Sequence, residues 1–597
     1  MKKIMLAAAV LLTFNASDGV AASKVEGVAA NNAEVSQAAN VAIGEDNKAS
    51  VGSLNIKDSE IKGVVVNNAN VKQAANVAIG KGNTATIGTT QLQDSKVTGA
   101  MINTANVKQA ANVAIGKDNT ANMGSTQVKG SDIKGAVINV GNVSQAANVA
   151  IGEKNTANLG STQVKDSTIK GAVINAGNVS QAANVAIGKD NTANLGSTQI
   201  EGSKVQGAVV NASNTSQAAN VAIGEKNTAN LGSTQLKNSD VKGAVVNVGN
   251  TTQAANVAIG KDNTAQLGST QLQGSKVQGS VINVGNTAQS ANVAIGKDNN
   301  ANLGSTQLKD SSVKGAVVNV GNTAGAANVA IGQGNNANLG STQIKGSDVK
   351  GAVVNVGNTA GAANVAIGKG SNANMGSTQI QSSDVKGAVV NVGNTAGAAN
   401  VAIGKGSNAN MGSTQIKGSD VKGAVVNVGN TAGAANVAIG KGTSANMSSL
   451  QIKNSTVKGA VINQGNVGAA ANVAIGKNSD ANMASVQVKN SSLKGAAVNQ
   501  ANVGAAANVA IGSNSNANMG SIQVKDGSVK GGLVNQANIG AAANVALGKG
   551  ASANMGSIQV KDSSVGGGIV NAGTVGLSAN VAIGSGSTSN SASVSSD

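Results

Sequence analysis

The side chains that could do chemistry in this sequence are of few kinds. It contains no cysteine, histidine or tyrosine, and all of its 43 basic residues are lysines. Without these residues, the usual pairs of nucleophile and base and the usual zinc or copper sites cannot be assembled. The acidic residues, such as Asp384, lie in polar segments beside lysines, which is typical of a solvated charged face. We therefore expect no enzymatic activity, no metal site and no cofactor.

Side-chain amides are the polar groups that recur most regularly. The segment Asn364-Val-Ala-Ile-Gly368, once with Leu for Ile, occurs sixteen times at a step of 36 residues, and Asn355 and Gln379 have equivalents at the same step. Because an amide carries donors and an acceptor, identical amides stacked one turn apart can hydrogen-bond along the stack. We predict three such ladders, whose members in two successive repeats are Asn355, Asn364, Gln379, Asn391, Asn400 and Gln415. Asn358 and Asn372 lie next to glycines and are interpreted as residues of turns or of outward strand positions, outside the ladders.

The elements that must position these amides are short strands. Each repeat divides into three blocks of 12 residues, and each block has a β-favouring run followed by Gly, Asn, Ser, Lys or Asp. When the sequence is aligned with itself after a shift of 36 residues, identical or similar residues coincide, whereas a shift of 18 residues aligns valine with asparagine. The sequence therefore predicts an all-β, cross-β-like, repetitive β-solenoid of sixteen 36-residue rungs, with about three short strands in each rung.

Alternating apolar residues within these strands predict the core. Period-two alternation is a strand signal, and the residues that share the apolar face are expected inside. We predict a core of Val354, Val356, Val365, Ile367 and Ile380. A single rung buries too little apolar surface to stand alone, so stability must come from stacking.

The two ends of the sequence differ from the repeats. Residues 1–22 combine two lysines, an apolar run and a small-residue segment, and we predict a signal peptide. Residues 23–583 are expected to form the solenoid, and residues 584–597 a Gly/Ser-rich C-terminal tail. No later segment is apolar enough to span a membrane. The mature protein is therefore expected to be extracellular or at the cell surface, with uncapped ends to which further subunits add.

Lysines recur at fixed positions as well, and the formal net charge is +17. One column contains Lys350, Lys386, Lys422 and Lys458. A column of cations can bind a polyanion, such as acidic polysaccharide or extracellular DNA, by counterion release. The alternative is that the lysines keep the faces soluble and prevent lateral aggregation.

The segment Gln145-Ala-Ala-Asn148-Val-Ala-Ile-Gly-Glu-Lys-Asn155-Thr-Ala resembles the repeats of curlin and of Fap-type fibre subunits. These are bacterial functional amyloids, so the resemblance implies outer-membrane secretion machinery and a homopolymer. The segment that begins at Asn364 also looks like the head repeat of trimeric autotransporter adhesins.

Two functions are expected for this protein. The first is a secreted structural protein that self-assembles end to end into amyloid-like extracellular fibres of a biofilm or surface matrix. The second is a monomeric β-solenoid adhesin or binding module for glycan, DNA or another surface.

Overall fold

The computed structural model describes residues 20–21, 24–45, 48–81, 84–118, 120–154, 156–190, 192–226, 228–262, 264–298, 300–333 and 336–596. These residues form strands and turns and no helix. Each strand pairs in parallel with the strand 36 residues further on, as Val353 does with Val389. The predicted β-solenoid with one 36-residue repeat per turn is therefore confirmed. The chain divides into two units, residues 1–258 and 259–597, and each is described by itself.

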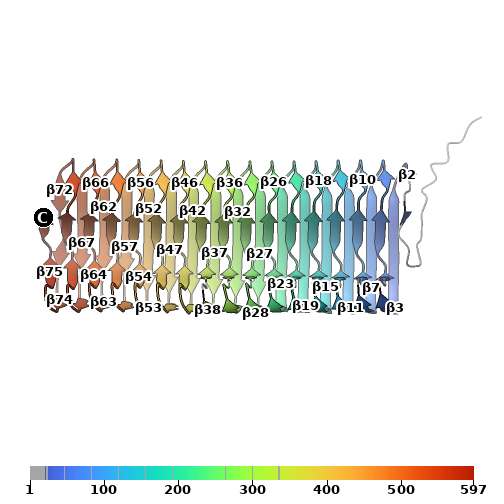
Figure 1. The fold of residues 1–597 in the computed structure, drawn as a ribbon, viewed down its shortest axis with the longest axis horizontal. Helices are drawn as coiled ribbons and strands as arrows, with labels where there is room; N and C mark the ends of the chain where they lie inside the picture. Colours follow the sequence, from blue (N-terminus) through green and yellow to red (C-terminus); the bar gives the residue numbers. More distant parts are fainter. Residues whose placement is uncertain are drawn as a thin grey trace, which may run out of the picture. The chain divides into compact units, whose positions relative to one another are not determined.

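In unit 1, one turn consists of one long strand and three short strands, except where the long strand is split into β27 (Val245–Thr252) and β28 (Ala255–Lys261). The strands of successive turns form a long sheet and a first, second and third short sheet, named in chain order, and Figure 1 shows their strands side by side within each unit. The turn thus has one strand more than the predicted three. A typical turn contains β15 (Val137–Glu153), β16 (Thr156–Leu159), β17 (Thr162–Lys165) and β18 (Thr168–Ile169).

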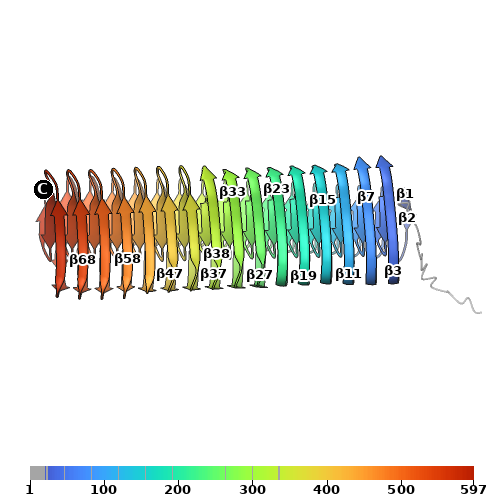
Figure 2. The same cartoon turned by 90° about the horizontal axis from the view of Figure 1, so that it is seen from below.

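In unit 2, the strand of the long sheet is split at a corner. Gly361 occupies this corner with a φ of 55°, whereas Gln145 of unit 1 has a φ of 50° at the equivalent position. Glycine adopts this left-handed conformation without steric strain, and glutamine does not. In Figure 2 the strands of the long sheet lie side by side along one face of each unit. A typical turn contains β42 (Val353–Ala360), β43 (Ala363–Ile367), β44 (Asn372–Met375), β45 (Thr378–Gln381) and β46 (Asp384–Val385).

The core lies between the long sheet and the three short sheets. Val353, Met375 and Val385 are fully buried, with 0 % exposure. Ala366 of the long sheet and Ala373 of the first short sheet are also fully buried, and they pack with their equivalents in neighbouring turns in one alanine cluster. Only small side chains separate these two sheets, so they approach each other closely there.

Most of the predicted core is on the wrong face. Of the five predicted core residues only Ile380, which is 1 % exposed, lies inside. The other four lie on the outer face of the long sheet, where Ile367 is 37 % exposed. For Val365 and Ile367 the physical reason is that the interior beside the alanine cluster is narrow and holds Ala366 and the hydrogen-bonded amide of Asn364. In β42 the inward positions are held by Val353 and Asn355, so the residues that alternate with them point outward. The four outward residues are Val354, Val356, Val365 and Ile367.

The expectations for the two ends of the chain also need revision. Residues 584–596 do not form a tail, because β75 (Thr588–Ser591) and β76 (Val594–Ser596) pair with strands of the preceding turn. In this turn Ser589 and Ser591 stand where the preceding turn has Ala553 and Met555. The predicted signal peptide lies outside the described residues, apart from Val20 and Ala21, which form β1.

Glycines at one corner allow a close approach of successive turns. A Cβ atom at Gly423 would lie 2.5 Å from the carbonyl carbon and oxygen of Gly387, and glycine stands at this position in all sixteen repeats. A Cβ atom at Gly504 would meet nothing closer than 3.8 Å, and the equivalent residue Ala432 shows that alanine fits there. The first site is crowded and the second is open.

We predict that Gly423→Ala destabilises the turns around it by about 3 kcal/mol, through overpacking against backbone atoms. The matched substitution Gly504→Ala should leave stability unchanged. Hydrogen exchange followed by mass spectrometry is the appropriate measurement, since a repeat array opens locally. Equal protection in the two variants would contradict the close approach at Gly423.

Candidate functional site: the amide ladders and the lysine rows

The first ladder lies in the interior of the long sheet. Asn355 is fully buried, and its Nδ2 donates to Oδ1 of Asn391 in the next turn at 2.8 Å. The hydroxyl of Thr378, in the second short sheet, donates to the same Oδ1 of Asn391 at 3.1 Å. The ladder therefore joins successive turns and also ties the long sheet to the sheet opposite. It links Asn31 through Asn247 in unit 1 and Asn283 through Asn571 in unit 2.

The second ladder faces the first short sheet. Nδ2 of Asn364 donates to Oδ1 of Asn400 at 2.9 Å and to the backbone oxygen of Ala337 at 3.1 Å. Both amide hydrogens are thus used, one along the ladder and one across to the opposite sheet. The hydrogen bonds of a buried amide offset the cost of removing it from water, and this explains why Asn364 can lie inside.

The third predicted ladder is also present, and a fourth was missed. Nε2 of the half-buried Gln379 donates to Oε1 of Gln415 at 3.1 Å. Asn374 is fully buried, and its Nδ2 donates to Asn338 at 2.8 Å. This fourth ladder points its donors toward earlier turns, opposite to the other three. The signal for it was in the sequence, since asparagine recurs at this position every 36 residues in most repeats.

Of the two interpretations of Asn358 and Asn372, the turn is wrong, and the outward strand position is confirmed for Asn358. Both lie in strands and form ladders, in which Asn358 donates to Asn322 and Asn372 donates to Asn336, each at 2.9 Å. The Asn358 ladder is exposed to solvent. Each of its amides uses one hydrogen and one lone pair within the ladder, so a second donor and acceptor per turn are left for a ligand or water.

A groove of about 840 Å³ runs along the outer surface of unit 1 beside the equivalents of Asn358. Its lining combines ladder asparagines, hydroxyl residues and one lysine with the valines at 107, 143 and 179. In unit 2, alanine or glycine stands at the positions equivalent to the groove serines, for example Ala360 and Gly504. The groove residues are Asn70, Asn106, Asn142, Asn178, Asn214, Asn250, Lys108, Ser144, Ser180, Ser216, Thr215, Thr252, Val107, Val143 and Val179.

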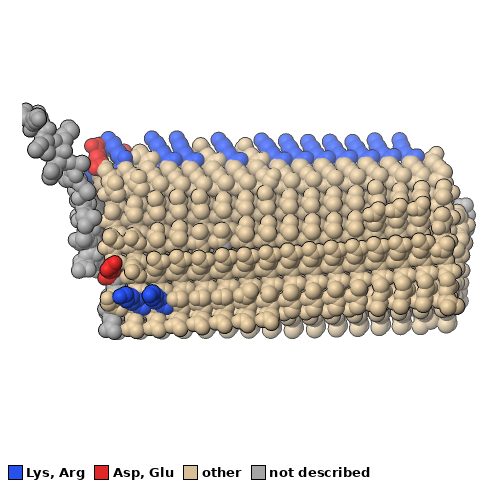
Figure 3. All heavy atoms as spheres, turned by 180° about the vertical axis from the view of Figure 1, so that it is seen from behind, with Lys and Arg blue, Asp and Glu red and all other residues tan. Residues whose placement is uncertain are grey.

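The lysines form rows on the surface of unit 2, and Figure 3 shows lysines in a row along one edge. The predicted column belongs to the first row, and all members of both rows are exposed. In the second row, Gln381 takes one lysine position. The first lysine row is Lys314, Lys350, Lys386, Lys422, Lys458, Lys494 and Lys530, and the second lysine row is Lys309, Lys345, Lys417, Lys453, Lys489, Lys525 and Lys561.

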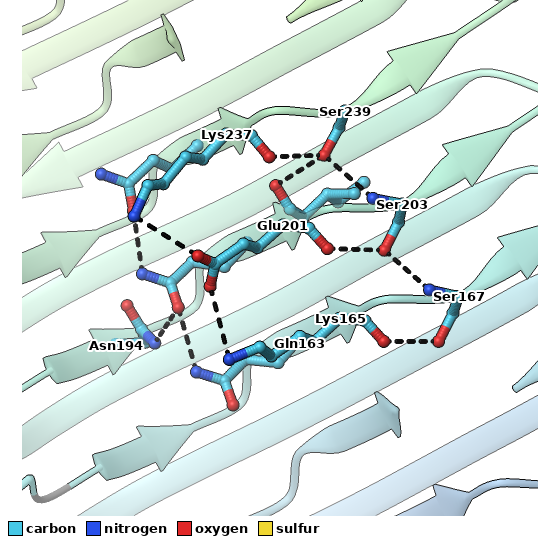
Figure 4. A network of polar contacts seen from close by, with 11 residues as sticks. Gln163, Lys165, Ser167, Asn194, Glu201, Ser203, Lys237 and Ser239 are labelled. Atoms are coloured by element: carbon cyan, nitrogen blue, oxygen red, sulfur yellow. Dashed lines mark hydrogen bonds and ion pairs between the residues drawn. The ribbon is translucent and has the colours of Figure 1, made fainter. Parts of the chain in front are cut away.

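In unit 1 several of the equivalent lysines are paired with acids. Glu201 lies between Lys165 and Lys237, with N–O distances of 4.0 and 3.3 Å, as Figure 4 shows. Nζ of Lys62 lies 2.9 Å from Oε1 of Glu26, and the hydrogen bond that it donates, together with its positive charge, lowers the pKa of that carboxyl group. None of the ion pairs formed by the described residues involves a lysine of the two rows in unit 2.

One acid of unit 2 occupies a ladder position. Asp480 stands where Asn372 stands in an earlier turn, and its Oδ1 accepts a hydrogen bond from Asn516 at 2.8 Å. Burial raises the pKa of the Asp480 carboxyl group, although the Asn516 hydrogen bond and the charges of Lys489 and Lys453 act in the opposite direction. The negative form is therefore disfavoured in this ladder.

Within the described ranges, no cluster of three or more acidic residues could hold a metal ion. No helix long and apolar enough to cross a membrane is found there either. Comparisons with protein-family models, with curated proteins and with solved structures gave no match. The candidate functional features are therefore the ladders, the groove and the lysine rows themselves.

We predict that Asn391→Ala strongly destabilises the turns that contact it. The substitution leaves the buried donors of Asn355 and Thr378 without partners, at about 1–3 kcal/mol for each group, and removes one of the two hydrogen bonds to Oδ1 of Asn427. Asn394→Ala, in the exposed ladder, should change stability by less than about 0.5 kcal/mol. Local hydrogen exchange would distinguish the two, and similar protection in both variants would contradict the assigned role of the buried ladder.

The raised pKa of Asp480 predicts a pH dependence of stability. Between its ordinary value and the raised value, the folded state holds a proton that the unfolded state has lost, so stability falls as pH rises through this interval. Asp480→Asn should raise the melting temperature at pH 7 and leave it unchanged at pH 3. A lower melting temperature of the variant at pH 7 would instead mean that Lys453 and Lys489 stabilise the charged form.

Proposed function

We propose that this protein is a secreted structural protein that self-assembles end to end into amyloid-like fibres of an extracellular matrix. The observation that carries the proposal is the strict register of its turns, in which each side chain stacks on its equivalent 36 residues away. Any turn can therefore act as a template for a turn of another molecule.

The direction of the ladders supports association with one polarity. Asn355 donates toward later turns and Asn374 donates toward earlier turns. A second molecule stacked in the same direction continues every ladder, whereas a reversed molecule places donors opposite donors. This favours head-to-tail addition, as in a polar fibre.

The outer face of the long sheet supports lateral contact between fibres. Its outward aliphatic side chains repeat in rows, and Ile331, Ile367, Ile439 and Ile475 are each 36–37 % exposed. Rows of partly exposed aliphatic residues on a regular sheet can pack against a second copy of the same face.

The last described turn presents a mixed surface. Ile569, equivalent to the fully buried Val353, is 38 % exposed, so the long sheet offers apolar surface to an added turn. The serines at 589 and 591 offer a polar surface at the first short sheet. We expect addition to this turn to depend mainly on the long sheet.

We predict that residues 23–597, freed from denaturant, form fibres that seed their own growth and give a meridional reflection at about 4.7–4.8 Å. Ile569→Lys, which places a charge on the open face of the last turn, should slow seeded elongation at least tenfold. The adjacent outward substitution Val570→Lys should leave the rate within about twofold, because this side chain already lies on the surface at 52 % exposure. Electron microscopy and light scattering would follow the reaction, and a β-rich protein that never elongates would contradict the proposal.

The groove of unit 1 favours a second function, that of a monomeric solenoid that binds a glycan. Its repeated amides and hydroxyls offer donors and acceptors along an extended path. Retention of soluble, monomeric protein by immobilised neutral polysaccharide, without any elongation, would favour this function over the fibre.

A further inference from the structure

Unit 2 has an uninterrupted row of lysines, which unit 1 does not have. In unit 1, the position of the first lysine row is held by Lys62, Lys134, Lys170 and Lys242 but is interrupted by Thr98 and Gln206. From Lys314 to Lys530 the row has a lysine in every turn, and all seven are exposed. The segment 259–597 contains 22 lysines and 10 acidic residues.

The backbone fixes the spacing of this row. The N–H of Lys386 donates to the oxygen of Val349 in the preceding turn at 2.9 Å, and that of Lys422 donates to Val385 at 2.9 Å. Successive lysines are therefore anchored one strand spacing apart, about 4.8 Å. At such a distance the repulsion between unit charges in water exceeds thermal energy, so the row holds counterions that a polyanion would release.

Acids compensate the row only in part. Asp348, Asp384 and Asp420 lie two residues before a lysine of the row on the same face of the third short sheet, and the turns that follow have Thr456 and Ser492 there. The second lysine row runs parallel on the other side of these residues. Asp310, Asp526 and Asp562 each follow a lysine of this second row. With fourteen lysines against these six aspartates, the two rows form a straight strip of net positive charge.

We propose that the two lysine rows of unit 2 bind an acidic polysaccharide, with the carboxylates of an extended polyuronate chain following the rows. A uronic acid chain carries one carboxylate per sugar, and each sugar advances the chain by little more than one strand spacing. The carboxylates of this ligand therefore stay close to the lysines of a straight row over many turns. The proposal does not depend on fibre formation.

Nucleic acids fit the strip less well. The phosphates of a DNA duplex wind around its axis, so a straight row meets them only where the two cross. Proteins that bind single strands stack the bases on aromatic side chains, and the one aromatic residue of this chain is Phe14.

The test compares two charge-matched variants of the full chain. The row variant changes Lys350, Lys386, Lys422 and Lys458 to Gln, which occurs naturally at this position as Gln206 and Gln278. The control variant changes four exposed lysines in the turn after the long sheet to Gln, which occurs there as Gln333. These control lysines are Lys369, Lys405, Lys441 and Lys477.

The probe is soluble alginate, and the measurement is its dissociation constant by calorimetry over a series of salt concentrations. We expect the row variant to bind at least tenfold more weakly at low salt. Its slope of log affinity against log salt should fall by about three, near 0.7 for each lost contact. The control variant should stay within about threefold of the parent chain. Replacement of the same four row lysines by arginine should preserve binding.

Three results would overturn the proposal. Equal weakening in the row and control variants would mean that only the net charge matters. Absence of alginate binding by the parent chain would mean that there is no such site. Tighter binding of duplex DNA than of alginate, with the same dependence on the row, would assign the strip to nucleic acid instead.

Discussion

A buried side-chain amide must have its hydrogen bonds made, and in this fold an identical amide one strand spacing away makes them. Asn355, Asn364 and Asn374 are fully buried, yet each donates to its equivalent in a neighbouring turn at 2.8–2.9 Å. A slip by one residue would place an amide against an aliphatic chain and leave donors unpaired in the interior. The constant 36-residue step is the consequence, because an insertion in any turn would break several ladders at once.

The ladders run in both directions, and this has an electrostatic consequence. Stacked amides aligned in one direction add their dipoles, as peptide groups do in a helix. Here the donors of the Asn355, Asn364 and Gln379 ladders point toward later turns, whereas those of the Asn374 and Asn358 ladders point toward earlier turns. Opposed ladders largely cancel, so a long stack does not accumulate a dipole. Each face of a turn still has a distinct pattern of donors and acceptors, which preserves the polarity of stacking.

The sequence was sufficient to predict the 36-residue period, the parallel stacking and the three ladders of Asn355, Asn364 and Gln379. All of these follow because a shift of 36 residues places identical or similar residues on one another. It was insufficient for the direction in which the side chains point. Alternation defines two faces, and we assigned the larger aliphatic residues to the interior, yet Val365 and Ile367 lie outside and Ala366 lies inside. The alanines at 366 and 373, which have equivalents in nearly every repeat, were the available signal, since small residues at facing positions indicate two closely packed sheets. The bond from Thr378 to Asn391 could not be predicted, because it depends on how two sheets meet in space.

The most direct test of the ladders is solid-state NMR of protein labelled with ¹³C and ¹⁵N in asparagine. The fold predicts through-space correlations between Nδ2 of one asparagine and Cγ of another, together with side-chain amide protons of the buried ladders that resist exchange with deuterated water. Side-chain amides that exchange within seconds and show no contact with other asparagines would contradict the account, because turns held by aliphatic packing alone would produce that result.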